Sequence, residues 1–287
     1  MTKRIKFFQI DSFTSKAFAG NPAGVVMDDD LSDSEMFLIT KEMNLPEIAF
    51  ISSSKTCDYK LRWITPTTEV DLCGHATIAV LHYLKENNLL KSNQEIKFET
   101  RSGILRCGFS KDLYYMEIPV LEIELFSHNK ENIFSALRIK KSITNTKIPL
   151  LLYNKILYIN INFLIDLNNV SPDFNELKKI CTNSPFNSLM LFTLQTNEEK
   201  NHAYSRFFAP AEGIDEDIVT GSANGPLLLI LKELNMIDTK SEEIFCTFEQ
   251  GDALGRSGRV NVKYHQKKSE LFIMGEAVTI LRGELLI

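Results

Sequence analysis

Residues Arg62–Pro66 read RWITP and residues Arg206–Pro210 read RFFAP, so that an arginine and an aromatic residue twice precede an apolar residue, a small residue and a proline. After an acidic turn, each segment leads to a glycine that opens an apolar stretch, GHAT at 74–77 and GSAN at 221–224. The two copies lie about half the chain length apart, as duplication of a half-chain unit would place them. The sequence therefore predicts two similar domains that face each other.

The stretch from Gly74 to Asn87 is apolar on nearly every side of a helix, for example at Ile78, Val80 and Leu84. A helix keeps such a pattern only where it is buried all round. Strand patterns flank it, so we expect an α/β (α+β) protein in which each half is a curved, mostly antiparallel sheet or barrel around a buried central helix. The expected domains are 1–118 and 119–277, with a last strand at about 278–287 that returns to the first domain.

Other expected elements follow from residue patterns of period two and of helical period. In the first half, strands are expected at Arg4–Phe13, Ala23–Met27, Glu47–Ser52, Tyr59–Ile64, Ile96–Thr100, Ile104–Phe109 and Tyr114–Ile118, and a capped surface helix from Asp30 to about Asn44. In the second half, strands are expected at Ile148–Tyr153 and Ile156–Ile161, and a helix at Ser171–Thr182. The pattern of residues 120–170 leaves the rest of that stretch open.

The two glycines at the starts of the apolar helices suggest a chemical role. The first backbone N–H groups of a helix have no intrahelical partner and carry partial positive charge, which attracts carboxylate or phosphate groups. His75 or Ser222, next to each glycine, can add a side-chain hydrogen bond, and both helix starts would aim into a cleft between the domains. The alternative is structural: each glycine only makes a turn, and Ser222 only caps its helix.

Composition limits the class of protein. With 44% hydrophobic and 24% charged residues, the chain is neither disordered nor fibrous. Its net charge of −5, without a basic run, argues against nucleic acid and against a membrane surface. No apolar stretch approaches the ~18 residues of a membrane helix, and the start has no signal-peptide core. We expect a cytoplasmic protein with a small-molecule or protein partner.

Metal, disulfide and nucleotide sites lack sequence support. The five cysteines are scattered and odd in number, without a CxxC pair, so reduced thiols are expected. Most histidines lack clustered partners, no metal site is expected, and His82 on the apolar helix should be a satisfied core histidine. Neither GxGxxG nor GxxxxGK[ST] occurs.

Taken together, the motifs resemble the PhzF-like isomerases, a phenazine-biosynthesis family with the diaminopimelate-epimerase fold of two similar α/β domains. The resemblance spans the whole chain. It rests on 11–14 (DSFT), 18–23 (FAGNPA), 44–50 (NLPEIAF), 62–66, 69–77 (EVDLCGHAT), 206–210, 216–223 (EDIVTGSA) and 249–251 (EQG).

The resemblance implies a cofactor-free isomerase in which one glutamate takes a proton from carbon and returns it elsewhere on the same substrate. It also implies a homodimer and a small carboxylate-bearing substrate of the dihydro-hydroxyanthranilate kind, although fold and motif do not fix the substrate. Residue by residue, it assigns catalytic roles to Glu47, His75 and Asp217, backbone donors to Gly74 and Gly221, and substrate binding to Ser222.

The chain departs from the family pattern at Pro46, where serine is usual, and at Ile218, where proline is usual. The related racemases use one cysteine in each half, but here Cys73 before Gly74 is matched by Thr220 before Gly221. A threonine hydroxyl is too weak an acid for that role, so two-thiol racemisation is improbable. A covalent Cys73–His75 mechanism lacks an identifiable third group that would orient it.

The setting of Glu47 suits proton transfer. A carboxyl group that must accept and then release a proton works best where burial disfavours its charge, and Leu45 and Ile48–Phe50 give Glu47 apolar neighbours. The structural alternative is an exposed glutamate at a strand edge. The functional alternative is a non-catalytic metabolite-binding protein that keeps the cleft.

Overall fold

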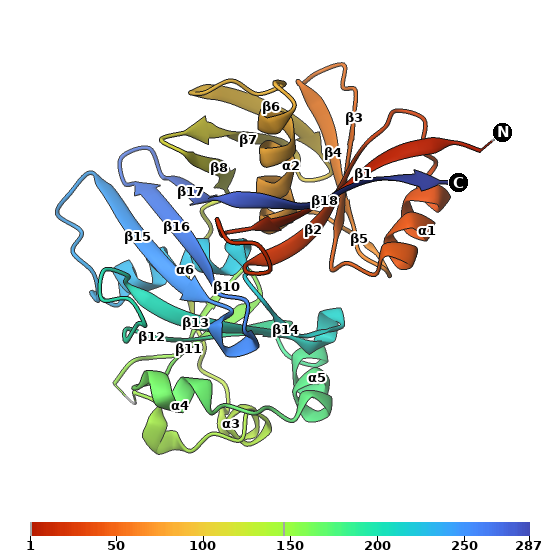
Figure 1. Ribbon diagram of the computed structural model, residues 1–287. Coiled ribbons are helices and arrows are strands. Elements are labelled where there is room, and N and C mark those ends of the chain that lie inside the picture. The colour runs from red at the N-terminus through yellow and green to blue at the C-terminus, as the bar shows by residue number, and fades with distance from the viewer. Residues whose placement is uncertain (1, 146) are drawn as a thin grey trace. The chain divides into compact units, whose positions relative to one another are not determined.

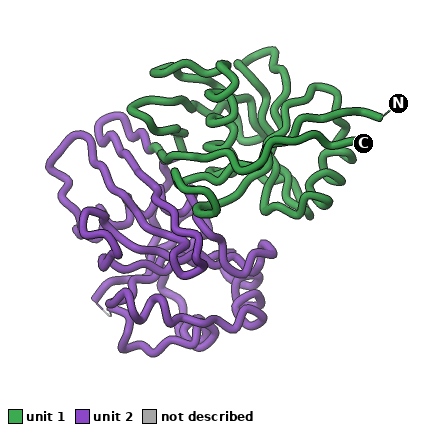
Figure 2. The backbone as a smooth tube through the Cα atoms, in the orientation of Figure 1, with its two compact units in different colours: residues 1–118, 272–287 green, residues 119–271 purple. Residues whose placement is uncertain are grey.

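The protein was analysed as a computed structural model that describes residues 2–145 and 147–287. The chain divides into two units, which are drawn in different colours in Figure 2. Unit 1 consists of residues 1–118 and 272–287, and unit 2 of residues 119–271. Each unit contains a curved sheet and a central helix (Figure 1), which confirms the expected mixed α/β fold.

The sheet of unit 1 pairs its strands in the order β18, β1, β2, β3, β4, β6, β7, β8. Neighbours are antiparallel except for the parallel pairs β2–β3 and β4–β6. The strands are β1 (Arg4–Ser12), β2 (Asn21–Met27), β3 (Ile48–Ser52), β4 (Tyr59–Ile64), β5 (Glu69–Val70), β6 (Gln94–Thr100), β7 (Gly103–Ser110), β8 (Leu113–Ile118) and β18 (Ala277–Leu286). The last strand of the chain therefore pairs with the first.

Helix α2 (Gly74–Glu86) is the helix that this sheet encloses. It contacts β1, β2, β3, β7, β8 and β18, and ten of its 13 residues are buried. The apolar pattern on all sides of this helix predicted such burial. Helix α1 (Asp33–Met43) packs Met36 and Ile39 on the opposite face, against Ile48, Phe50 and Ile64. A capping box of Ser32 and Glu35 fixes its first turn.

Unit 2 repeats the same order of pairings. Its neighbours β10–β11, β12–β13 and β15–β16 are antiparallel, and β11–β12 and β13–β15 are parallel. The strands are β9 (Glu124–Leu125), β10 (Leu151–Tyr153), β11 (Ile156–Asn160), β12 (Ser188–Thr193), β13 (Ala203–Ala209), β14 (Ile214–Asp217), β15 (Glu243–Gln250) and β16 (Gly258–His265), and β17 (Glu270–Gly275) continues into unit 1. Helix α6 (Gly221–Glu233) has the length of α2, and both end in Leu-Lys-Glu.

Short helices fill the stretch that the sequence pattern left open and the segment after it. They are α3 (Glu131–Ala136), α4 (Leu164–Asn168) and α5 (Phe174–Thr182), with a 3-10 turn at Lys141–Ile143. Further 3-10 turns lie elsewhere in unit 2, at Pro210–Glu212 after β13 and at Asp252–Leu254 after β15. Several expected boundaries are shifted by one to three residues, and two of these shifts have a clear local cause. Helix α5 begins at Phe174 rather than Ser171, because the Asp173 side chain caps it by accepting from the Glu176 N–H. Strand β10 begins only at Leu151, since Pro149 has no N–H to donate to a ladder.

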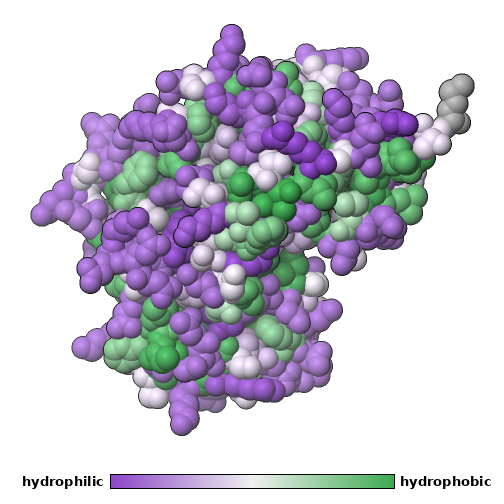
Figure 3. Space-filling model, viewed as in Figure 1, coloured by the Kyte–Doolittle hydropathy of each residue, from purple (hydrophilic) through white to green (hydrophobic). Residues whose placement is uncertain are grey.

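Polar residues cover most of the face seen in Figure 3, with apolar patches between them. Among the described residues, no helix is both long and apolar enough to cross a bilayer.

An arginine–glutamate pair in each unit, partly buried in unit 1 and about nine-tenths buried in unit 2, fixes the turn that leads to the central helix. In unit 1, Arg62 Nε and Nη2 donate to Glu69 at 2.9 and 2.7 Å. In unit 2, Arg206 donates in the same two-pronged way to Glu216, at 2.7 Å for both bonds. Arg206 Nη1 also donates to the carbonyls of Leu167 and Val170, at 3.0 and 2.7 Å. We call these two pairs the arginine clamps.

The Arg206 clamp should contribute strongly to stability, because both of its side chains are about nine-tenths buried. Replacing Arg206 by Met leaves Glu216 charged and unpaired, which should lower the free energy of unfolding by about 3–5 kcal/mol. Arg138→Met, which breaks an exposed pair with Asp173, should cost less than about 1 kcal/mol. Urea unfolding of both variants checks this, and equal small effects would contradict it.

His82 of α2 links two strands that flank the helix, as expected of a satisfied core histidine. Its Nδ1 lies 3.0 Å from the Tyr114 hydroxyl on β8, and its Nε2 lies 3.1 Å from Thr279 Oγ1 on β18. Thr279 donates its own proton to Glu86 at 2.7 Å, and Glu86 pairs with Arg282. Thr279 therefore accepts from Nε2–H, and the neutral ring accepts at Nδ1 from Tyr114. Glu86 Oε1 also lies 3.4 Å from Nε2.

Burial lowers the pKa of His82, although Glu86 opposes this shift and Arg282 adds to it. The folded protein therefore favours the neutral ring, so this contribution to stability is present above the unfolded-state pKa of about 6.5 and is lost as pH falls. The melting temperature should drop between pH 7.5 and pH 5, and by less in His82→Gln. The exposed His128→Gln variant should keep the full drop. Equal drops in wild type and His82→Gln would refute this role.

Candidate active site

Glu47 lies directly before β3, where the sheet of unit 1 faces α2. Its backbone carbonyl accepts from Gly24 N–H on β2 at 3.0 Å, which fixes its place in the sheet. Its neighbour Ile48 packs in the cluster on the α1 face, and successive side chains of a strand alternate between faces. Glu47 therefore points to the α2 face, where only 8% of the residue is exposed. It is not an exposed strand-edge residue.

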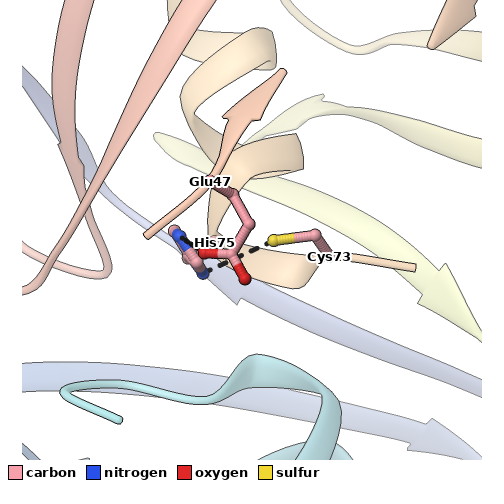
Figure 4. A group of neighbouring side chains, drawn as sticks. All are labelled: Glu47, Cys73 and His75. Atoms are coloured by element: carbon pink, nitrogen blue, oxygen red, sulfur yellow. Dashed lines mark hydrogen bonds and ion pairs between the residues drawn. The ribbon is translucent and has the colours of Figure 1, made fainter. Parts of the chain in front are cut away.

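His75, the second residue of α2, meets Glu47 there. The His75 Nε2 and Glu47 Oε2 atoms lie 3.2 Å apart (Figure 4). Their contact with each other is poorly aligned as a hydrogen bond, and among the described residues neither buried atom has another partner. Buried polar atoms are nearly always satisfied in folded proteins, so this pair has unused capacity to bind a ligand.

Cys73 lies on the other side of the same ring. Its Sγ is 3.6 Å from His75 Nδ1, and the residue is buried (Figure 4). The backbone around it is held by two short bonds: Ser12 Oγ donates to the His75 carbonyl at 2.7 Å, and Thr77 Oγ1 donates to the Cys73 carbonyl at 2.6 Å. The imidazole is thus placed between a thiol and a carboxylate.

The charges of the three groups depend on one another. Burial disfavours a charged imidazole, but Cys73 and Glu47 outweigh it and hold the pKa of His75 well above its usual value. Burial raises the pKa of the Cys73 thiol, against the opposing effect of His75. The two neighbours therefore favour the charged form of the imidazole, while burial favours the neutral form of the thiol.

The donors of Glu47, Cys73 and His75 also fall within 4.8 Å of one another, and all three are types that zinc accepts. Sequence reasoning expected no metal residues and did not foresee this grouping. However, Cys73 faces Nδ1 and Glu47 faces Nε2, on opposite sides of one ring. Ligation of one ion by all three would require the ring to turn. The arrangement as it stands is a chain of polar contacts.

In unit 2, the expected residues Asp217, Gly221 and Ser222 lie at the start of α6. Thr220 Oγ1 donates to Asp217 Oδ2 at 2.5 Å. Asp217 and Ser222 are partly exposed, and Gly221 is the first residue of the helix. The predicted site residues thus fall into two groups. Asp217, Gly221 and Ser222 belong to unit 2, and Glu47, Gly74 and His75 belong to unit 1.

A buried amide that sequence reasoning did not single out organises this helix start. Gln250 Oε1 accepts from the Thr220 backbone at 3.0 Å and from Asn224 Nδ2 at 2.6 Å, while its Nε2 donates to the Asp217 carbonyl at 3.0 Å. The following Gly251 has φ +90°, and a Cβ there would collide with the Arg256 carbonyl. The motif EQG at 249–251 was the available signal.

The neighbouring Glu249 has a structural role. It is fully buried, and its carboxylate accepts from the backbone N–H groups of Asn197 and Glu198 and from Asn201 Nδ2, at 2.7–2.9 Å. It holds the loop before β13 in place.

The sequence profile of the phenazine biosynthesis-like proteins (PhzC-PhzF) matches residues 10–283. The chain belongs to this family. An uncharacterized isomerase of Clostridium acetobutylicum is 37% identical over the full length of both chains. The crystal structure of a PhzF-family phenazine biosynthesis protein of Bacillus anthracis matches with a TM-score of 0.91 and 28% identity, covering 99% of this chain and 100% of that one.

A further solved structure, of a predicted epimerase of Pseudomonas aeruginosa, shares the fold with a TM-score of 0.79 at 19% identity over 99% of both chains. The expected resemblance to the PhzF family and the expected epimerase-like fold are therefore both confirmed.

The His75 ring of this family member should titrate above its ordinary pKa of 6.5. Replacing Glu47 by Gln removes the balancing carboxylate and should lower the pKa of His75. Because the folded-state pKa exceeds the unfolded one, the pair stabilises fully below a pH of about 6.5 and loses this contribution as pH rises through the folded value. NMR titration of ring-labelled histidine measures both variants. A His75 pKa that Glu47→Gln leaves unchanged would contradict the pairing.

Proposed function

We propose that this protein is a cofactor-independent isomerase in which Glu47 moves a proton between carbon atoms of a small carboxylate-bearing substrate. The observation that carries the proposal is the contact between Glu47 Oε2 and His75 Nε2, two buried polar atoms 3.2 Å apart that have no other hydrogen-bond partner in the described part of the chain. A buried acid–base pair with unused bonding capacity is typical of a site that a substrate completes. The isomerase names of the relatives agree with this chemistry.

Glu47 would act first as base and then as acid. Its carboxylate takes the proton of a substrate C–H bond, and the electron pair of that bond moves into the substrate. The adjacent His75 imidazolium and the backbone N–H groups at the start of α2, Gly74 included, stabilise the negative charge that develops. The protonated carboxyl then returns the proton to a different carbon. Because a single group carries it, the proton leaves from and returns to the same face of the substrate.

The resemblance to PhzF-like isomerases supports small cyclic amino- or hydroxy-acids as the first substrates to test. Three further expectations stay predictions. They are the catalytic role of Asp217, substrate binding by Gly221 and Ser222, and the homodimer.

Replacement of Glu47 by Gln should abolish proton transfer while keeping the shape of the side chain. Proton NMR in deuterated buffer, with a panel of small carboxylates that includes a dihydro-hydroxyanthranilate, should show deuterium entering a carbon position or a new isomer with wild-type protein. In Glu47→Gln, the rate of deuterium incorporation or isomer formation should fall by at least about a hundredfold. Asp217→Asn in the same assay tests the role expected for that residue.

Glu42→Gln, an exposed glutamate on α1, is the matched control and should retain the wild-type rate. A full rate in Glu47→Gln would refute the assignment of the proton carrier. Ligands that raise the melting temperature without any exchange across the panel would favour a metabolite-binding protein.

A further inference from the structure

The residue before each central helix occupies the N-cap position but does not cap its helix. The Thr220 side chain forms no capping hydrogen bond to the backbone of α6. The Cys73 side chain forms no well-aligned one to α2, although the Ala76 N–H approaches its sulfur. Each instead faces an ionisable neighbour: Cys73 Sγ lies 3.6 Å from His75 Nδ1, and Thr220 Oγ1 donates to Asp217 at 2.5 Å. Neither side chain is held by a well-formed bond to its own helix, so each is available to the neighbour that it faces.

The chemistry of a thiol suits this place next to an imidazole. A neutral thiol has one S–H donor and a sulfur acceptor. When His75 is charged, both ring nitrogens carry protons, so Nδ1–H can donate to the sulfur. When His75 is neutral, the S–H can donate to a bare Nδ1. The Glu47 carboxylate, which can only accept, faces Nε2 at 3.2 Å and favours a proton there. With the ring proton on Nε2, the bare Nδ1 of the neutral ring is left to accept from the thiol.

We propose that Cys73 is a positioning residue that keeps Nε2 of His75 a hydrogen-bond donor whether the ring is charged or neutral. The inference rests on the proposed function, since Nε2–H is the donor that would stabilise charge on the substrate beside Glu47. The thiol itself exchanges no proton with the substrate. It supports the tautomer and the orientation of the ring by donating to Nδ1, whereas the carboxylate of a catalytic triad accepts from Nδ1–H and leaves Nε2 bare.

The backbone around the pair supports a fixed ring. Ser12 Oγ holds the His75 carbonyl and Thr77 Oγ1 holds the Cys73 carbonyl, so the two residues keep their relative position at the start of α2. Both side chains are buried, which removes the water that would otherwise compete for Nδ1.

Ring-nitrogen NMR of ¹⁵N-histidine-labelled, chelator-treated protein tests this without substrate. Above the His75 titration midpoint, the wild type should show a single neutral tautomer with the proton on Nε2. Cys73→Ala should show a mixture of tautomers or the Nδ1–H form. Cys73→Ser, whose hydroxyl also donates and accepts, should restore the Nε2–H form at least in part. Cys57→Ala, at a half-buried thiol outside this cluster, is the control and should match the wild type.

A kinetic readout accompanies the spectra once a substrate is known. Cys73→Ala should lower kcat about tenfold with little change in KM, because the oriented donor acts mainly on the developing charge, and Cys73→Ser should recover part of the loss. An unaltered Nε2–H tautomer in Cys73→Ala would overturn the inference. This outcome is separate from a failure of the proposed function, which shows as undiminished exchange in Glu47→Gln.

Discussion

The enclosure of α2 by its sheet is the constraint on which unit 1 depends. A helix that is apolar on all sides is stable in water only where every side is covered, and six strands from both ends of unit 1 cover this one. The same enclosure removes water from the first turn of the helix. Cys73 and His75 therefore lie in a dry environment as a direct consequence of how the core is built, and their polar interactions are correspondingly strong.

The arginine clamps fix the turns that connect the sheets to the first residues of α2 and α6. Each joins the strand before the turn to the short strand after it, β4 to β5 and β13 to β14. A buried ion pair often contributes little net stability compared with apolar residues, but it tolerates few alternative arrangements. Here it fixes the direction from which the chain enters α2 and α6, and so the position of the residues at their first turns.

Much of this architecture could be predicted from sequence, because the strongest signals are local. The all-round apolar pattern predicted α2, the capping box predicted α1, and the repeated arginine segments indicated two similar halves. Residues 120–170 could not be read, since their helices and strands are short and depend on packing with distant segments. Pro149 shortened β10 where the apolar run alone suggested a longer strand.

The candidate site was predictable only in part for the same reason. Family resemblance identified Glu47 and His75, but their contact is a product of tertiary packing that no spacing in the sequence encodes. The grouping of Cys73 with them depends on a side chain that turns away from its own helix, and the bonds of Gln250 depend on the pairing of β15 with β13. Both arrangements depend on contacts between segments that are far apart in the sequence.

The pairing of β18 with β1 has a consequence for the order of folding. Strand β1 precedes all of unit 2 in the chain, and β18 follows it, so the wall around α2 cannot be completed during synthesis until unit 2 has been made. Contacts of such high sequence separation form slowly, because a long loop must close first. Unit 2 is continuous in sequence and has no such delay. On the ribosome, the half that contains Glu47 and His75 should therefore be the later of the two to mature.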